Sequence, residues 1–288
     1  MRLGVSQIMS ETFAIARRRF WSLLGMQLTW FAILIGLMIV SMIAIGGGAV
    51  AFGSLLSDAE IVGPGAGIGF LFGMLVLYAG YLLIACAQYA AMCTLASPLR
   101  RGGFGDAFSS GIRSAPTLLV VFIVMIVGYF VVAFALSAVG ALFAAQNSAL
   151  SLVFGLLVLA VLIWLGSRLG IVLPIVPVDG VRNPIRAIGR AWSLTRGNAV
   201  PIFLAFLVFV VVAVVLIALA TVPFMGTLAA LGLDGSGMPS DAAVGGGVVA
   251  MFLLLMLAGV VIAILYAALL SAIHGLLAGG TQAAEVFE

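Results

Sequence analysis

The stretch that decides the fold is PIFLAFLVFVVVAVVLIALATV, residues 201–222, which contains no charged side chain. A helix needs roughly 20 apolar residues to cross a hydrocarbon core about 30 Å thick. The stretch is apolar on every face, which is typical of a membrane-spanning helix and not of the striped helices in a soluble bundle. We therefore predict a transmembrane helix here.

Five further stretches have the same apolar character. Together with residues 201–222 they predict six spans, the others being 21–45, 70–96, 117–143, 150–174 and 248–277. The chain of 288 residues is 65% hydrophobic and 7% charged, against about 25% charged residues in ordinary globular domains. No hydrophilic stretch is long enough for a separate soluble domain. The predicted fold is all-α, a single polytopic membrane helix bundle over residues 1–288.

All twelve basic residues are arginine, and they occupy alternate connections between the spans. The two termini and the segments after the second and fourth spans, counted with Arg168 near the inner end of the fourth span, hold all of them and five acidic residues, giving 12 − 5 = +7. The other connections hold only four acidic residues, giving 0 − 4 = −4: Asp58, Glu60, Asp234 and Asp241. Short arginine-rich loops stay in the cytoplasm. We predict a bacterial inner-membrane protein with both termini cytoplasmic.

Three segments on the arginine-rich side share a pattern. An aromatic residue, Phe13, Phe108 or Trp192, precedes a span by eight or nine residues, and an arginine follows it after four or five positions. The aromatic residues are 108 − 13 = 95 and 192 − 108 = 84 positions apart. We predict three units, residues 1–97, 98–178 and 179–288, each with a short cytoplasmic-side amphipathic helix followed by two spans.

The third of these short helices is the most clearly marked. Asn183 suits its N-cap and Pro184 its first position, and Gly197 suits a left-handed end. Arginines recur every four residues between them, so one face carries Arg182, Arg186 and Arg190. The other face carries Ile185, Ile188, Trp192 and Thr195. Such a helix can lie in the membrane interface with its apolar side among the lipid headgroups.

Around this helix the chain resembles a known family. The residues concerned are PIVPVDG at 174–180, Ala187, and RAWSLTRGN at 190–198. They are similar to the signature of the glycerophosphoryl diester phosphodiesterase membrane-domain family, which includes the YciC-like six-span membrane proteins of bacteria. The resemblance implies membrane residence and association with lipid. Because the sequence ends at Glu288, directly after the last span, we expect no catalytic domain.

Catalytic, metal and cofactor sites are not predicted. His274 is the only histidine, and no second ligand lies near it in sequence. Cys86 and Cys93 are two helical turns apart, which is about 10 Å and beyond the reach of a disulfide. An intramembrane enzyme would need a cluster of nucleophile, acid or metal ligands that the sequence does not show. We therefore expect a protein that is not an enzyme.

Two polar residues are predicted to lie inside the spans. Gln88, in the second span, and Arg168, near the inner end of the fourth, lie at similar depths. Charged residues in spans usually face the bundle interior or water. Three alternatives follow for Arg168: it binds a lipid phosphate, it pairs with Asp179 or Glu285, or it extends to the inner headgroups.

The predicted function is that of a non-catalytic membrane module that binds anionic lipid or a protein partner. The residues expected at this interface are Arg17, Arg18, Arg19, Arg168, Arg182, Arg186, Arg190, Trp192 and Arg196. The partner in question is a second protein or another copy of the chain, and not a nucleic acid. One alternative is a carrier of a lipid or small hydrophobic solute, with a water-accessible cavity lined by Gln88 and Arg168. Another is an accessory subunit of a separate phosphodiesterase.

Overall fold

The computed structural model describes residues 3–57, 64–100, 102–144, 148–233 and 241–287, and in these ranges every element is an α-helix. In chain order the helices are α1 (Val5–Arg18), α2 (Phe20–Ser57), α3 (Pro64–Ala96), α4 (Phe104–Ala144), α5 (Ser148–Leu169), α6 (Val172–Val178), α7 (Pro184–Leu194), α8 (Ala199–Leu233) and α9 (Asp241–Phe287). Six segments are long and apolar enough to cross a membrane: Phe20–Ile43, Gly73–Ala96, Phe104–Ala141, Leu152–Val178, Ala199–Pro223 and Gly246–Gly279. The predicted all-α, multi-pass membrane protein is confirmed.

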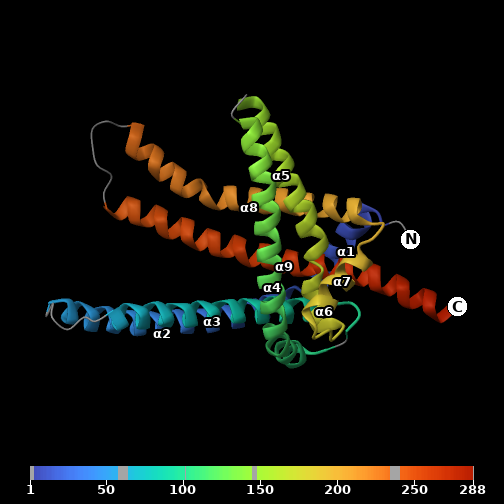
Figure 1. Ribbon diagram of the computed structural model, residues 1–288, viewed down its shortest axis with the longest axis horizontal. Coiled ribbons are helices and arrows are strands. Elements are labelled where there is room, and N and C mark those ends of the chain that lie inside the picture. The colour runs from blue at the N-terminus through green and yellow to red at the C-terminus, as the bar shows by residue number, and fades with distance from the viewer. Residues whose placement is uncertain (1–2, 58–63, 101, 145–147, 234–240, 288) are drawn as a thin grey trace.

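The long helices form three hairpins that diverge from a common region. Figure 1 shows the pairs α2/α3, α4/α5 and α8/α9 extending away from the place where α1, α6 and α7 gather. We call this place the base; it comprises α1, α6, α7 and the ends of the long helices that adjoin them. The three hairpins are called the arms.

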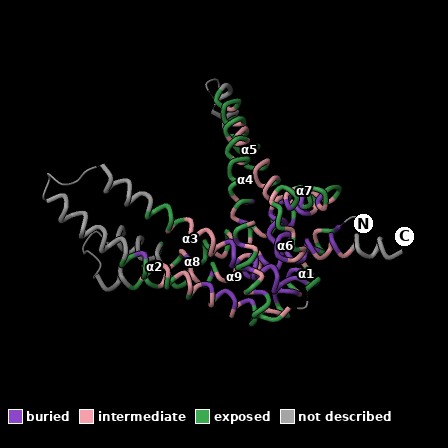
Figure 2. Tube along the Cα trace, turned by 60° about the horizontal axis from the view of Figure 1, so that its bottom comes forward, coloured by how far each residue is buried: buried purple, intermediate pink, exposed green. Residues whose placement is uncertain are grey.

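The packed core lies in the base. Its fully buried side chains include Leu23, Met92, Ile175 and Leu270. Along the arms large apolar side chains are exposed instead, and Phe134 is 79% exposed. Figure 2 shows this change from buried base to exposed arms. Exposure of such a side chain to water costs about 1.5–3 kcal/mol, so the arms require a lipid environment.

The short helix that leads each predicted unit packs on the arm of another unit. α1 packs mainly on α9 and α8. The first turns of α4 pack on the first hairpin, where Phe108 stacks on Trp30 with ring centroids 4.9 Å apart. α7 contacts α4, α5 and α6, and Trp192 meets Trp164 of α5 at 6.0 Å. The three arms are thereby held together at one end.

The repeat alignment also matches buried positions. Applying the offsets of 95 and 84 residues aligns Thr12 with Ala107 and Ala191, and Ala16 with Gly111 and Thr195. All six of these residues are buried. Each leading helix therefore presents small side chains four residues apart to the arm on which it packs, and this spacing places them on one helical face.

The second short helix is not a separate element, which corrects the prediction of three separate short helices. α4 runs from Phe104 through Pro116 to Ala144. Figure 1 shows its first turns nearly end-on and the later turns running up the page, so the helix bends. Proline removes one backbone donor and crowds the preceding turn, and this bends a helix without necessarily ending it.

The fourth predicted span, residues 150–174, also differs from the structure. α5 ends at Leu169, and the short helix α6 begins at Val172. Pro174 has no N–H to donate to the carbonyl of Gly170, and the N–H of Leu173 bonds to this carbonyl instead, at 3.1 Å. The tighter bond turns the chain between α5 and α6. The end of the span thereby becomes part of the base.

Candidate functional site

Arg168 is buried where α5 meets the end of α7. Its side chain is at the C-terminal end of α5, and the residue is 7% exposed. Nε donates to the hydroxyl of Thr195 at 3.1 Å, and Nη2 donates to the carbonyl of Trp192 at 3.4 Å. The guanidinium carbon lies 3.9 Å from the ring centroid of Trp192 and 5.2 Å from that of Trp164. Hydrogen bonds and cation–π contact together fasten α7 to α5.

These contacts decide between some of the alternatives for Arg168. The residue does not pair with Asp179, whose carboxylate instead contacts Arg190 and His274. The side chain of Glu285 lies outside the described residues. Binding of a lipid phosphate by Arg168 stays a prediction. Because the guanidinium is committed to α7, the side chain has a structural role in the base whatever else it does.

Helix α7 has the predicted ends, and two residues of its predicted interfacial face, Ile185 and Trp192, are exposed. The Asn183 side chain accepts from the N–H groups of Ile185 and Arg186, and Gly197 has a φ of +86°. Ala187 and Ala191 are buried, whereas Ile185 is 77% and Trp192 41% exposed. The small residues pack because they allow close approach to the neighbouring helices. The exposed isoleucine and tryptophan leave α7 with an apolar surface beside its arginines.

Asp179 joins three helices at the base. It follows α6, accepts from Nε of Arg190 in α7 at 2.8 Å, and contacts Nε2 of His274 in α9 at 3.3 Å. A carboxylate can only accept, so this contact requires the hydrogen on Nε2 of His274. Burial alone would raise the pKa of the Asp179 carboxyl, but the hydrogen bonds and charges of His274 and Arg190 outweigh it, and the pKa is lowered from 3.8.

Gln88, the second predicted intramembrane polar residue, bonds within the bundle. Its Nε2 donates to Oε1 of Gln27 in α2 at 2.8 Å, and both residues are buried. An interhelical amide bond of this kind satisfies polar groups that lipid could not satisfy. Gln88 therefore joins the two helices of its own arm, and the structure does not bring it together with Arg168.

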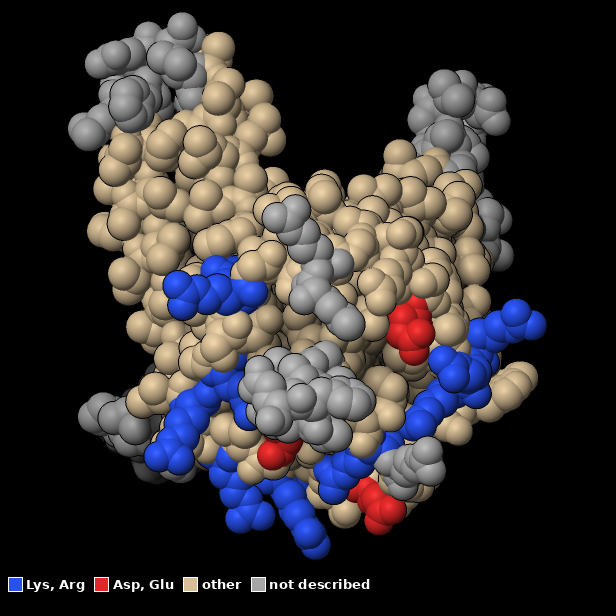
Figure 3. Space-filling model, turned by 90° about the vertical axis from the view of Figure 1, so that its right-hand side faces the viewer, with Lys and Arg blue, Asp and Glu red and all other residues tan. Residues whose placement is uncertain are grey.

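The remaining predicted arginines lie on the surface of the base. Arg18 is 3.5 Å from Glu11, and Arg19 donates to the carbonyl of Leu95. Four are exposed and make no side-chain hydrogen bond within the described part of the chain: Arg17, Arg182, Arg186 and Arg196. Figure 3 shows arginines gathered over the base with few acidic residues among them.

Ten of the twelve arginines are described, and all ten lie at the base. The described acidic side chains there are Glu11, Asp106 and Asp179, so the described charge of the base is 10 − 3 = +7, with histidine neutral. Ion pairs within the described residues involve only two of these arginines, Arg18 with Glu11 and Arg190 with Asp179. The surface therefore has a strong positive potential that favours anions.

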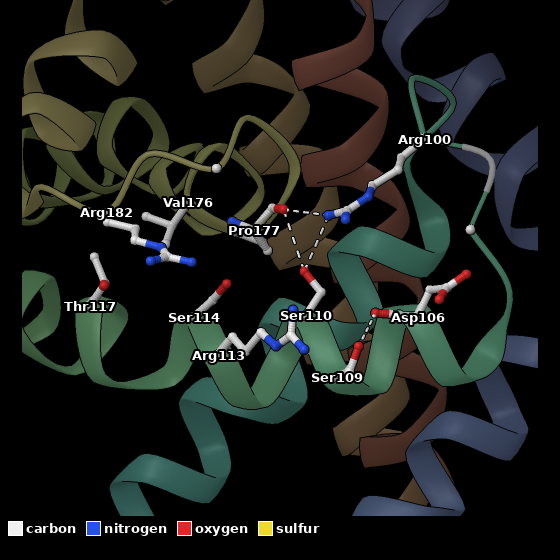
Figure 4. Close-up of a pocket in the computed structure, with 12 residues that line it drawn as sticks. Arg100, Asp106, Ser109, Ser110, Arg113, Ser114, Thr117, Val176, Pro177 and Arg182 are labelled. Carbon is white, nitrogen blue, oxygen red and sulfur yellow. Dashed lines mark hydrogen bonds between the residues drawn. The ribbon is translucent and has the colours of Figure 1, made fainter.

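A polar cavity of about 410 Å³ opens on the base between α4 and the segment that joins α6 to α7. Its charged lining residues are Arg100, Asp106, Arg113 and Arg182, and its hydroxyl groups come from Ser109, Ser110, Ser114 and Thr117. Figure 4 shows the arrangement. Of these residues only Arg182 had been selected from the sequence, although Arg100 and Arg113 share the arginine-rich side. Nothing in their spacing indicates that they lie near Arg182. The other side of the cavity is formed by α6, whose direction is set by the turn between α5 and α6.

A second cavity, of about 170 Å³, is mainly apolar and lies between α4, α5, α6 and α9. It is lined by residues such as Tyr129, Gly166 and Tyr266. Neither Gln88 nor Arg168 lines this cavity or the polar one. The cavity expected for a carrier, with these two residues in its wall, thus coincides with neither of the two cavities.

Comparison with known proteins gave one match, which covers residues 142–278. Neither a search of curated proteins nor a search of solved structures gave a match. The match that was found covers Arg168, Asp179, α7 and His274, and leaves out α1, Arg100 and Arg113. Residues 142–278 match the family model of the membrane domain of glycerophosphoryl diester phosphodiesterase, which confirms over this range the resemblance predicted from the sequence.

Proposed function

We propose that this chain is a non-catalytic membrane module whose base binds anionic lipid headgroups at the cytoplasmic face of a bacterial inner membrane. The observation that carries the proposal is the surface of α7. Ile185 and Trp192 are exposed there next to exposed arginines, Arg186 among them. An apolar strip beside a basic strip suits the boundary between acyl chains and headgroups.

The charge of the base supports an anionic ligand. The described residues sum to +7 at this end, and each arginine near an anionic bilayer surface contributes about 1 kcal/mol of attraction. The same distribution supports a cytoplasmic base, because positive loops are retained inside the cell. Helices α1 and α9, the first and last of the described helices, meet at the base, and we propose a cytoplasmic position for both ends of the chain.

Two observations support a non-catalytic role. Among the described residues, no group of three His, Cys, Asp or Glu side chains is placed to hold a metal ion. The family match is to a membrane domain. The polar side chains in the spans, Gln88 and Arg168, bond to other helices and so support the packing of the bundle.

Lipid-dependent thermal stability of the purified chain in a non-ionic detergent tests the proposal. Phosphatidylglycerol is expected to raise the midpoint of unfolding more than phosphatidylcholine does, and added salt should reduce the difference by screening. The double variant Arg17→Gln, Arg186→Gln should lose much of it. The matched variant Arg17→Lys, Arg186→Lys keeps the charge and should retain it. Equal stabilisation of the unaltered chain by both lipids would contradict the proposal.

The carrier and the accessory-subunit alternatives are less well supported. A carrier needs a route for its solute, and Gln88 and Arg168 were expected to line it. Both side chains instead form hydrogen bonds within the protein, Gln88 with Gln27 and Arg168 with Thr195. An accessory subunit needs a surface for its enzyme, and the basic base would serve for that too. Recovery of a phosphodiesterase with the full chain, abolished by the Arg17→Gln, Arg186→Gln variant, would favour the second alternative.

A further inference from the structure

The polar cavity of the base has the composition of an oxyanion site. Its charged lining residues sum to 3 − 1 = +2, from Arg100, Arg113, Arg182 and Asp106. Asp106 is turned to its own helix end, where its carboxylate accepts from the N–H of Gly103 at 3.2 Å. None of the ion pairs in the described structure joins Asp106 to an arginine. The three arginines of the cavity therefore form no ion pair with the Asp106 carboxylate, and the cavity has a net positive charge.

One arginine builds the wall of the cavity. Nη1 of Arg100 donates to the carbonyl of Pro177 at 2.8 Å and approaches the hydroxyl of Ser110 at 3.3 Å. The Pro177 carbonyl lies in the last turn of α6, where helices leave acceptors without an intrahelical partner. Arg100 thus joins α6 to the connection before α4 by hydrogen bonds and fixes the distance between the two sides of the cavity.

The other two arginines are free to bind a ligand. Arg113 projects from α4 and Arg182 from the segment before α7, and neither guanidinium makes a hydrogen bond within the described residues. Figure 4 shows them lining the cavity from two elements, with the hydroxyl of Ser114 between their guanidinium groups in this view. Guanidinium groups bind phosphate oxygens in pairs, and hydroxyls donate to the oxygens that remain.

The position of the cavity suits a ligand from the membrane. Thr117 lines it and also begins the apolar part of α4, in which Val120 and Ile123 are exposed. A phosphate in the cavity would therefore lie directly beside a helix surface that acyl chains cover. A volume of about 410 Å³ also lies within the range of roughly 300–1,000 Å³ that is usual for small-ligand sites.

We propose that this cavity binds one phosphate ester group, with Arg113 and Arg182 on its oxygens and Ser114 as a further donor. The site adds a specific headgroup-binding cavity to the proposed lipid function. That the ligand comes from the membrane rests on this proposed function. The same chemistry would accept the headgroup of an anionic phospholipid or a soluble phosphate. The cavity itself is independent of α1 and of the exposed strip of α7, so the two proposals can fail separately.

Calorimetric titration of the full chain in non-ionic detergent tests the site, with the heat of mixing into empty micelles subtracted. The probes are dioctanoyl phosphatidic acid, inorganic phosphate, and dioctanoylglycerol, which lacks the phosphate. We expect saturable binding of one phosphatidic acid per chain and none of dioctanoylglycerol. Binding of phosphatidic acid at least tenfold tighter than inorganic phosphate assigns the ligand to the membrane, and equal binding assigns it to solution.

The variants Arg113→Gln and Arg182→Gln should each weaken binding at least tenfold, and Arg113→Lys, which keeps the charge but loses the planar fork, should be intermediate. Arg18→Gln is the matched control, because Arg18 is an exposed arginine of α1 that contacts Glu11 and does not line the cavity. It should change binding less than twofold. Unchanged thermal unfolding verifies that each variant is folded.

The site is overturned if the unaltered chain binds neither phosphate compound saturably, or if Arg18→Gln weakens binding as much as Arg113→Gln. Failure of the lipid proposal looks different: phosphatidylglycerol and phosphatidylcholine would stabilise the chain equally while inorganic phosphate still bound in the cavity. Survival of the phosphatidylglycerol effect in the Arg113→Gln, Arg182→Gln double variant, with titration heats also unchanged, would likewise count against the cavity.

Discussion

Two helix contacts in the base, which we call seams, involve equivalent positions of the repeat and are stabilised by different means. The first seam is the contact of α4 with α3 at Gly111, and the second is the contact of the end of α7 with α5 at Thr195. In the first, Gly111 of α4 lies on α3, so close that an added Cβ would lie 2.5 Å from the carbonyl oxygen of Ala87 and 2.8 Å from Cβ of Ala91. In the second, the equivalent residue is Thr195, which receives a hydrogen bond from Arg168. One seam depends on the absence of a side chain, and the other depends on a polar partner.

The comparison predicts that added volume damages the first seam most. Gly111→Ala should lower the free energy of unfolding by about 2–3 kcal/mol, because the contacting atoms include backbone and overpacking typically costs 1–3 kcal/mol. This loss should appear although alanine is by itself favoured over glycine in helices by roughly 1 kcal/mol. Thermal unfolding of the purified chain in detergent measures it.

Gly128 provides the control for this substitution. It lies in the same helix, α4, but in the arm, where no atom lies within 4 Å of an added Cβ. Gly128→Ala should therefore leave stability unchanged or raise it slightly. A fall of the same size in both variants would show that the first seam has no special packing requirement.

The stability of the second seam should depend on the Thr195 hydroxyl, which accepts the hydrogen bond from Arg168. Thr195→Val keeps the shape of the side chain but leaves Nε of the buried Arg168 without a partner, at a cost of about 1–3 kcal/mol. In an Arg168→Met background the same substitution should cost much less, because the donor is gone. Unfolding of the four proteins in this cycle gives the coupling between the two residues.

Thr221 offers a matched threonine outside the seam. Its hydroxyl bonds to the carbonyl of Ala218 in its own helix at 2.8 Å, and α8 keeps this carbonyl satisfied without it. Thr221→Val should change stability by less than about 0.5 kcal/mol. If Thr195→Val were equally mild, the contact of Arg168 with Trp192 would have to hold the seam alone.

The spans could be predicted from the sequence because apolar length is a local property. Residues 201–222 indicate a span without reference to any other segment, and α8 contains them. The fourth apolar run was predicted, but the break in its helix was not, because the break depends on a single proline: Pro174 lies within the run, and only its missing N–H redirects the bond of Gly170. The leading part of α4 continues into its span through Pro116, whereas a separate short helix was predicted there.

The candidate site could be predicted only in part. The arginine-rich side is visible in the sequence because charge is counted residue by residue. The convergence of Arg113 with Arg182 is not visible, since it depends on how α6 packs against α4 and α3. For Arg168 a signal was present: Thr195 and Trp192 were placed on the apolar face of the short helix before the fifth span, and a hydroxyl on such a face indicates a buried polar partner.

A third junction, made by Asp179, should give the smallest effect and the only one that depends on pH. The pKa of its carboxyl is lowered in the folded chain, from 3.8, because His274 and Arg190 outweigh burial. A lowered pKa means that the ionised group stabilises the fold above its unfolded pKa, and that this contribution is lost as the pH falls through the lower, folded value. The difference in unfolding midpoint between the unaltered chain and Asp179→Asn should therefore be present above pH 4 and shrink as the pH falls further.

Glu11→Gln separates this junction from general acid sensitivity. Glu11 also faces an arginine, Arg18, at 3.5 Å, but Arg18 is 70% exposed and such surface pairs contribute about 0–1 kcal/mol. Its substitution should shift the midpoint little at any pH. If Asp179→Asn behaved in the same way, the carboxylate would not join α6, α7 and α9, and the base would depend on its two packed seams, at Gly111 and at Thr195.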